Sequence, residues 1–315
     1  MVIRTLKYLT VGAAAVLVVS GTALATDNVP AVAEQTMAQP VTEAVAPGPP
    51  PLPTLMSRQV GVSPPDASGP QRTARAQCPS GTKVVGGGGE GVVSPGFTRQ
   101  LIPTRLVPDT TTNQYVVTVT DFNPFNAQDE WFVVAYATCA PTPIDYAVIS
   151  VPTPLSSEPI QQVTVPCPGR LAIGTGAEII AQADEKVGLQ TTFSTVTGSD
   201  VTVRAQDTHG SVAQPWRLVG YAICMRAETF VQPSNVTGPA RRNLVRTTCP
   251  IGFLLGTGAR VNNTPHDIVI NRIRPSSDLL TVEVRVMKVS SPTPSPPDAT
   301  WTVAAQGICN GALTN

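Results

Sequence analysis

The sequence predicts an all-β protein made of three antiparallel sheet repeats. One pattern occurs three times: it opens with Cys-Pro and two glycines one residue apart, and it closes with Trp, seven residues and Cys. The composition agrees, because charged residues make up 13% and aromatic residues 5% of the chain, while Val, Thr, Gly and Pro are plentiful. No window after residue 25 shows the apolar spacing of three and four residues that an amphipathic helix requires.

The three copies contain all six cysteines and all three tryptophans of the chain. The opening cysteines and their glycine pairs are Cys78 with Gly86 and Gly88, Cys167 with Gly174 and Gly176, and Cys249 with Gly256 and Gly258. The closing pairs are Trp131 and Cys139, Trp216 and Cys224, and Trp301 and Cys309. A repeat fixes the architecture before any single element does, so we expect β repeats at 55–140, 141–225 and 226–315.

The residues before the first repeat are expected to be an export signal and a tether. Two basic residues precede the apolar run 8–19, and Ala23-Leu24-Ala25 offers a small-x-small cleavage site, so residues 1–25 are typical of a secretory signal peptide. Residues 26–54 end in a proline-rich stretch that cannot join a sheet interior, which predicts a disordered linker. We therefore expect a secreted, extracellular protein with no membrane span in the mature chain.

The charge of the chain argues against nucleic acid as a partner. Its 21 basic and 21 acidic residues balance, and removal of residues 1–25 takes away two bases and no acid, which leaves 19 − 21 = −2. Lys and Arg are spread thinly, without the basic stripe that phosphate backbones require. A polybasic membrane anchor is equally unsupported.

Four or five strands are expected in each repeat, separated by turn-forming Pro, Gly, Ser and Asp residues. In the second repeat they cover 161–165, 171–180, 188–196, 201–205 and the segment from Trp216 to Cys224.

The closing strand of each repeat is expected to turn its Trp/Cys face inward. Side chains alternate between the two faces of a strand, so a Trp and a Cys eight residues apart share one face. In the first copy Val133, Ala135 and Ala137 lie between them on that face, which is apolar and small toward the cysteine. Trp131, Trp216 and Trp301 are therefore predicted to be structural core residues, and a sugar-stacking role is the alternative. The opposite face is mixed and is expected to be partly exposed.

The glycine pairs are interpreted as bulges or sites of close backbone approach. A phosphate-binding loop would need a helix to begin after the glycines, whereas strand residues follow them here.

An oxidising compartment makes the six cysteines a disulfide set. Of the possible pairings, two are symmetric across the repeats. We favour the one within repeats, Cys78–Cys139, Cys167–Cys224 and Cys249–Cys309. The other pairs Cys139 with Cys167, Cys224 with Cys249, and Cys309 with Cys78.

The whole pattern resembles a β-repeat module of secreted and surface proteins of bacteria, associated with actinobacteria and with the ends of collagen-like surface proteins. The likeness covers residues 73–139, 163–224 and 245–309. The second copy departs from it, because it lacks one residue after Pro168. The resemblance implies an extracellular compartment and a β fold, and no particular activity.

No catalytic, cofactor-binding or metal-binding residue is predicted. His209 and His266 lie in different loops, and neither has a second ligand at metal-binding spacing. The acidic residues Asp129-Glu130, Asp184-Glu185 and Asp207 are interpreted as solvated loop residues rather than a paired-carboxylate site.

The preferred architecture packs the three sheet repeats about a pseudo-threefold axis, as in β-prisms, and the alternative is three tandem small β-sandwiches. We expect a non-enzymatic structural or cell-surface binding protein, whose partner is a cell-surface protein or a glycan. A lectin-like carbohydrate-binding module is the alternative, with a secreted hydrolase or an inhibitor behind it. Three equivalent sugar sites are disfavoured because polar positions differ between copies: Glu90 and Glu178 correspond to Arg260. Recognition is expected in the loops that differ, at 94–114, 181–187, 206–215, 262–267 and 288–300.

Overall fold

The chain forms eighteen β-strands and no helix in the ranges that the structure describes. This computed structural model describes residues 56–64, 69–94, 99–122, 130–181, 186–195, 198–208, 214–226, 231–238, 243–263, 266–290 and 300–311. The signal peptide and the linker predicted for residues 1–54 lie outside these ranges. Within them, no helical segment has the length and apolar character that crossing a bilayer requires.

Six strands recur in the same order in each third of the chain. The first third forms β1 (Ser57–Val62), β2 (Gln71–Gln77), β3 (Thr82–Val93), β4 (Leu101–Asp109), β5 (Gln114–Asp121) and β6 (Trp131–Pro141). The second forms β7 (Ala147–Pro152), β8 (Ile160–Pro166), β9 (Leu171–Ile180), β10 (Val187–Ser194), β11 (Asp200–Asp207) and β12 (Arg217–Met225). The third forms β13 (Val231–Thr237), β14 (Leu244–Thr248), β15 (Phe253–Asn262), β16 (Ile268–Pro275), β17 (Thr281–Lys288) and β18 (Thr302–Asn310).

Five of these six strands lie where the sequence places them, and the first of each set was missed. β1, β7 and β13 are short edge strands, and each pairs antiparallel with the closing strand of its own third, β6, β12 or β18. Their sequences, SRQVGV, AVISVP and VQPSNVT, share no motif. Only the ladder to the closing strand identifies them.

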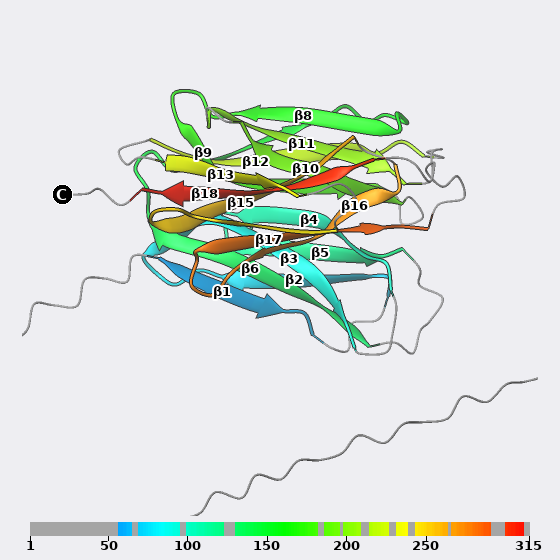
Figure 1. Cartoon of the computed structure of the whole chain (residues 1–315), viewed down its shortest axis with the longest axis horizontal. Coiled ribbons are helices and arrows are strands. Elements are labelled where there is room, and N and C mark those ends of the chain that lie inside the picture. Colours follow the sequence, from blue (N-terminus) through cyan, green and yellow to red (C-terminus); the bar gives the residue numbers. More distant parts are fainter. Residues whose placement is uncertain are drawn as a thin grey trace, which may run out of the picture. The chain divides into compact units, whose positions relative to one another are not determined.

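The strands assemble into three antiparallel six-stranded sheets. We name them sheet A (β1-β6-β3-β16-β17-β14), sheet B (β2-β5-β4-β9-β12-β7) and sheet C (β13-β18-β15-β10-β11-β8). Each sheet takes three strands from one third of the chain and three from another. In Figure 1, β16 (orange) accordingly lies beside β3 (cyan), although the two are far apart in sequence.

The expectation that each repeat forms its own sheet is therefore wrong, and so is the alternative of tandem sandwiches. A repeat supplies half of one sheet and half of the next, so that the three repeats close in a ring and the first joins the third in sheet A. The pseudo-threefold arrangement of three sheets is confirmed.

The three disulfides pair Cys78 with Cys139, Cys167 with Cys224 and Cys249 with Cys309, which is the set within repeats. Each joins the residue after a β2-type strand to the closing strand of the same repeat, and these two strands belong to different sheets. Each bond closes a loop of roughly 60 residues, worth about 4 kcal/mol in the chain-entropy model. The staples therefore hold the two halves of every repeat together across the core.

The first glycine of each pair meets the other repeats at the pseudo-threefold axis. The residue before it (Val85, Ile173 or Leu255) sits at a bulge in the ladder. A Cβ atom on Gly86 would overlap the carbonyl oxygen of Leu255, one on Gly174 that of Val85, and one on Gly256 that of Ile173. Only glycine permits this cyclic backbone contact.

The second glycine permits the joint between two repeats within a sheet. A Cβ atom on Gly88 would overlap the carbonyl oxygen of Ile273 on β16, and one on Gly176 would come within 2.6 Å of that of Leu106 on β4. The joints are short, with two paired residues each in β3–β16, β4–β9 and β10–β15. The close-approach interpretation of the glycine pairs therefore agrees with the geometry.

One hydrophobic core runs through all three repeats. It includes Trp131 (3% exposed) and Trp216 (0%), and the partly buried Trp301 packs against it. The ring N–H of Trp216 donates to the carbonyl of Glu158 at 3.0 Å. The opposite face of the closing strands is more covered than expected, because long side chains lie across it: Tyr136 is 4% exposed beneath Arg58, whose guanidinium is 5.1 Å from its ring centre.

Candidate binding face on sheet A

A carboxylate and an arginine clasp the joint between repeats in two of the three sheets. In sheet A, Arg272 pairs with Glu90 across β16 and β3, with Nε 2.5 Å from Oε2. In sheet B, Arg105 pairs with Glu178 across β4 and β9, with Nε 3.2 Å from Oε1. These glutamates thus help to hold the ring of repeats together.

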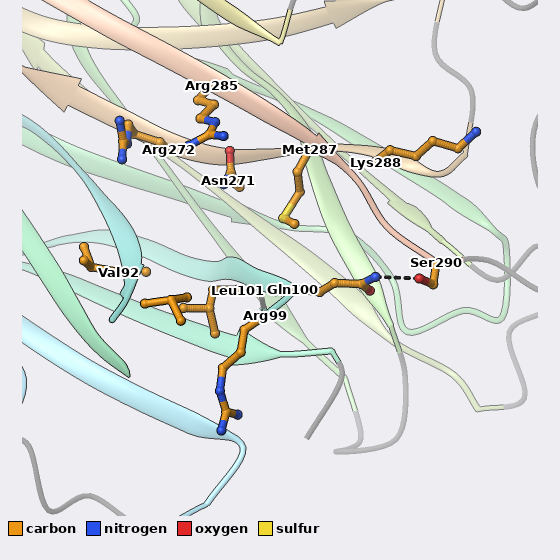
Figure 2. A pocket seen from close by; sticks show the side chains of 12 residues that line it. Val92, Arg99, Gln100, Leu101, Asn271, Arg272, Arg285, Met287, Lys288 and Ser290 are labelled. Atoms are coloured by element: carbon orange, nitrogen blue, oxygen red, sulfur yellow. Dashed lines mark hydrogen bonds between the residues drawn. The ribbon is translucent and has the colours of Figure 1, made fainter. Parts of the chain in front are cut away.

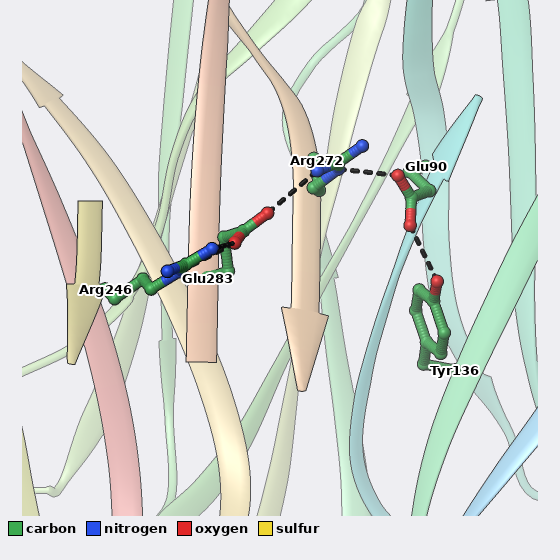
Figure 3. Close-up of polar contacts among 5 residues, drawn as sticks. All are labelled: Glu90, Tyr136, Arg246, Arg272 and Glu283. Atoms are coloured by element: carbon green, nitrogen blue, oxygen red, sulfur yellow. Dashed lines mark hydrogen bonds and ion pairs between the residues drawn. The ribbon is translucent and has the colours of Figure 1, made fainter. Parts of the chain in front are cut away.

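The clasp in sheet A extends into a chain of polar contacts across five strands (Figure 3). Tyr136 donates its hydroxyl to Glu90 at 2.6 Å, and Arg272 donates to Glu283 at 2.8 Å. Glu283 also accepts from Arg246, whose Nη2 lies 2.6 Å away. Partial burial disfavours the Glu283 carboxylate, but hydrogen bonds from the two arginines outweigh it and lower its pKa.

The tyrosines at the two clasps also have raised pKa values. Burial, followed by the hydrogen bond and charge of Glu90, raises the pKa of Tyr136. Burial and then the charge of Glu178 raise the pKa of Tyr221 to about 12, and its hydroxyl donates to that carboxylate at 2.9 Å. Both tyrosines therefore stay protonated donors at neutral pH.

The outer surface of sheet A carries a concentration of arginines that the other sheets lack. We call Arg58, Arg246, Arg272, Arg274 and Arg285 together the arginine face. The strand registers place Val148, Arg75, Arg105, Val107 and Thr118 at the matching positions of sheet B, and Pro233, Thr164, Thr191, Phe193 and Arg204 at those of sheet C. Five arginines on sheet A thus correspond to two on sheet B and one on sheet C; at other positions, sheet B adds the exposed Arg217 and sheet C the exposed Arg260. With Glu90 and Glu283 included, the arginine face has a charge of 5 − 2 = +3.

Two hollows flank the β16–β17 pair on this side of the molecule. One, of about 680 Å³, lies toward Asn271 and Lys288 and is lined by Arg272, Arg285 and Met287 among others. Figure 2 shows Arg272, Arg285, Asn271 and Met287 on one side of it and Val92 and Leu101 on the other. The second hollow, of about 540 Å³, is lined by Arg58, Arg246, Arg274 and Glu283, with serine and threonine side chains beside them.

The arginines of the face differ in how far their charge is neutralised. Arg272 and Arg246 are held by carboxylates, and Arg58 donates to the carbonyl of Pro275 at 2.8 Å. Arg274 and Arg285 are exposed, and no carboxylate of the described residues contacts them. Both open onto the hollows, which leaves two cations directed at solvent in shaped, polar depressions.

The residues weighed as active-site candidates are not brought together. Asp207 is buried at the end of β11, Glu130 is exposed before β6, and His266 is partly buried before β16. His209, Asp129, Asp184 and Glu185 lie outside the described residues. Within the described ranges, no group of three or more His, Cys, Asp or Glu side chains could hold a metal ion.

The arginine face itself was missed by sequence reasoning, and a signal for it exists. Arg272 and Arg274 alternate along β16, and Glu283 and Arg285 alternate along β17. Alternation places each pair on one face of its strand. The pairing of those strands with β3 and β14, which gathers the arginines, is visible only in the folded chain.

Comparison with known proteins does not assign the chain to a family. No protein-family model matches the chain, and no curated protein matches its sequence.

Proposed function

We propose that this chain is a secreted, non-enzymatic binding protein of the cell surface, and that its arginine face holds an acidic polysaccharide. The observation that carries the proposal is the surplus of arginine on one of three otherwise equivalent sheets. A scaffold residue recurs because every repeat must meet the same packing demand. A cluster found on one sheet alone is not required for packing and so points to binding. Exposed cations in polar hollows suit an anionic ligand.

Export is part of the proposal and rests on two supports. Three disulfides are typical of proteins that mature in an oxidising compartment. The N-terminal pattern of basic head, apolar run and small-x-small site is typical of a signal peptide. The likeness of the repeat to secreted actinobacterial modules agrees with both.

The spacing of charge favours a polysaccharide over a nucleic acid. Double-stranded DNA carries one negative charge per about 1.7 Å of its axis. The arginine face instead has cations about 5 to 7 Å apart, as neighbours on adjacent strands or two residues along one strand. Glu283 lies among them, next to both Arg246 and Arg274 in register. A carboxylated polysaccharide, with one charge per sugar, meets less repulsion from this glutamate than a dense phosphate backbone does.

The test is binding of polygalacturonate, a polymer with one carboxylate per sugar, with neutral dextran as the uncharged comparison. We expect the wild-type chain to bind polygalacturonate and not dextran, and the affinity to fall as NaCl is raised. The double variant Arg274→Gln/Arg285→Gln should bind at least about tenfold more weakly, because two charge-assisted contacts are lost.

A matched control removes the same charge from another sheet. Arg75 and Arg217 are exposed on sheet B, and Arg75→Gln/Arg217→Gln should keep wild-type affinity. Equal loss in both double variants would show unspecific attraction and contradict a site on sheet A. Absence of binding to any polyanion would leave a structural role, and release of new reducing ends from polygalacturonate would contradict the non-enzymatic assignment.

A further inference from the structure

The joint in sheet C lacks the carboxylate that clasps the joints in sheets A and B. The matching row runs Glu90–Arg272 in sheet A and Glu178–Arg105 in sheet B. In sheet C it runs Arg260–Thr191–Arg204 across β15, β10 and β11. Two arginines therefore flank one threonine on the same face, about 10 Å apart across two strand spacings.

No carboxylate among the described residues forms an ion pair with Arg260 or Arg204. The row continues to Ala304 on β18 and to Gln162 on β8, neither of which is acidic. The nearest carboxylate on this face of β11 is Asp200, four residues from Arg204 or about 13 Å along the strand. Among the described residues, none forms a hydrogen bond or ion pair with the Arg204 side chain, and its Nε is shielded from solvent without a hydrogen-bond partner.

The surroundings hold Arg260 in place and leave room beside it. The Arg260 guanidinium stacks 4.7 Å from the ring centre of Phe193, which is 8% exposed. A hollow of about 360 Å³ adjoins the row, lined by Thr191, Phe193, Ser194, Thr195, Thr202 and Arg260. Its hydroxyls and its aromatic wall suit a small organic group carried by an anion.

We propose that the row Arg260–Thr191–Arg204 is a binding site for a tetrahedral oxyanion, carried as a phosphate or sulfate monoester whose organic part occupies the adjoining hollow. The ligand supplies the negative charge that a glutamate supplies in the other two sheets, where Arg260 now stands at the glutamate position. Two guanidinium groups and one hydroxyl offer three sets of donors, and a monoester has three terminal oxygens to accept them, whereas a carboxylate has two. This site lies on a different sheet from the arginine face and does not depend on it.

The experiment measures binding by calorimetry in the Arg274→Gln/Arg285→Gln background, so that the two arginines of the arginine face without a carboxylate partner are removed. The probes are inorganic phosphate, inorganic sulfate, phenyl phosphate, phenyl sulfate and acetate. We expect phenyl phosphate or phenyl sulfate to bind more tightly than its inorganic ion, and acetate to bind at least about tenfold more weakly than either ester. The tighter of the two esters identifies the source of the oxyanion.

Three further variants test the assignment to these residues. Arg204→Gln and Arg260→Gln should each weaken ester binding by about tenfold or more. Thr191→Glu places a carboxylate of the protein between Arg260 and Arg204. It should therefore abolish ester binding and raise the melting temperature. Arg75→Gln on sheet B is the control and should leave binding unchanged.

Two results would overturn the proposal: esters that bind the Arg204→Gln and Arg260→Gln variants as tightly as the background, or a Thr191→Glu variant that is folded and still binds. If the Arg274→Gln/Arg285→Gln variant binds polygalacturonate more weakly and still binds the ester, this site is independent of the arginine face.

Discussion

The hydroxyl of Tyr115 donates a hydrogen bond to the carbonyl of Thr175, 3.1 Å away, and so completes a ring of contacts between the repeats. Around the axis, the Thr175 hydroxyl donates to Thr257 at 2.8 Å, and the Thr257 hydroxyl donates to Gly87. The first repeat has glycine where the others have threonine, so it lacks the third hydroxyl. Tyr115 fills this gap, at a position where the other repeats have Val201 and Val282.

The ring predicts a strong coupling between positions 87 and 115. Tyr115→Val should destabilise the protein by about 3 to 5 kcal/mol, because it empties a fully buried ring site and leaves the Thr175 carbonyl without its donor. Gly87→Thr alone should also destabilise, since its Cβ would lie 2.5 Å from the Tyr115 ring. The double variant recreates the threonine and valine of the other repeats and should recover at least about 1 kcal/mol of the summed cost.

A double-mutant cycle by urea unfolding measures this coupling. The Tyr136 carbonyl also crowds position 87, so recovery is expected to be partial. Additive costs would mean that tyrosine and glycine do not compensate for each other at the axis.

Removing the glutamate of each clasp should cost different amounts in the two sheets. Glu90 is 3% exposed and binds both Arg272 and Tyr136. Glu90→Ala should therefore destabilise the protein by about 3 kcal/mol, because it leaves Arg272 and Tyr136 without their shared carboxylate. Glu178→Ala is the matched variant. Its ion pair is more open to water, with side chains of Arg105 and Glu178 exposed by 37% and 22%, and it should cost about 1 kcal/mol or less. Equal costs in chemical unfolding would refute burial as the cause.

Acidification should weaken the fold partly through Glu283. Its folded pKa lies below the usual 4.5, so its contribution to stability is fully present above that pH and is lost as the pH falls through the lowered value. The free energy of unfolding should therefore drop between neutral pH and about pH 3, and Glu283→Gln should flatten that drop. Glu158→Gln, which removes an exposed carboxyl without an ion pair among the described residues, should leave the slope unchanged. A slope that Glu283→Gln does not alter would count against this carboxylate.

A chain that ends at residue 226 should fail to fold cooperatively. It lacks β13–β18 and therefore half of sheet A and half of sheet C, although both of its disulfides can form. The edges of β3 and β10 would be exposed, with apolar core on one side. Calorimetry should show a sharp transition for the full chain and a broad or absent one for the shortened chain. A sharp transition in both would mean that repeats are independent units.

The sequence by itself determined the parts that each repeat specifies locally. The alternation of Val and Thr with turn residues predicted five strands of six, because strand period and turn chemistry are local properties. The equal spacing of Trp131 and Cys139 with their counterparts placed them on one inward face. The symmetry of three copies left two disulfide sets open, and the preference for one bond within each repeat selected the set that forms. The glycine pairs were correctly read as sites of close approach, because no side chain can intrude there.

Only the tertiary structure decided how the repeats share their sheets and where charge gathers. β3 pairs with β16 because the three repeats close in a ring, and no residue near either strand in the sequence predicts this pairing. The joint brings Glu90 to Arg272, and with it assembles an arginine face from both ends of the chain. Long-range pairing sets which side chains become neighbours, so a binding surface built across repeats has no linear motif.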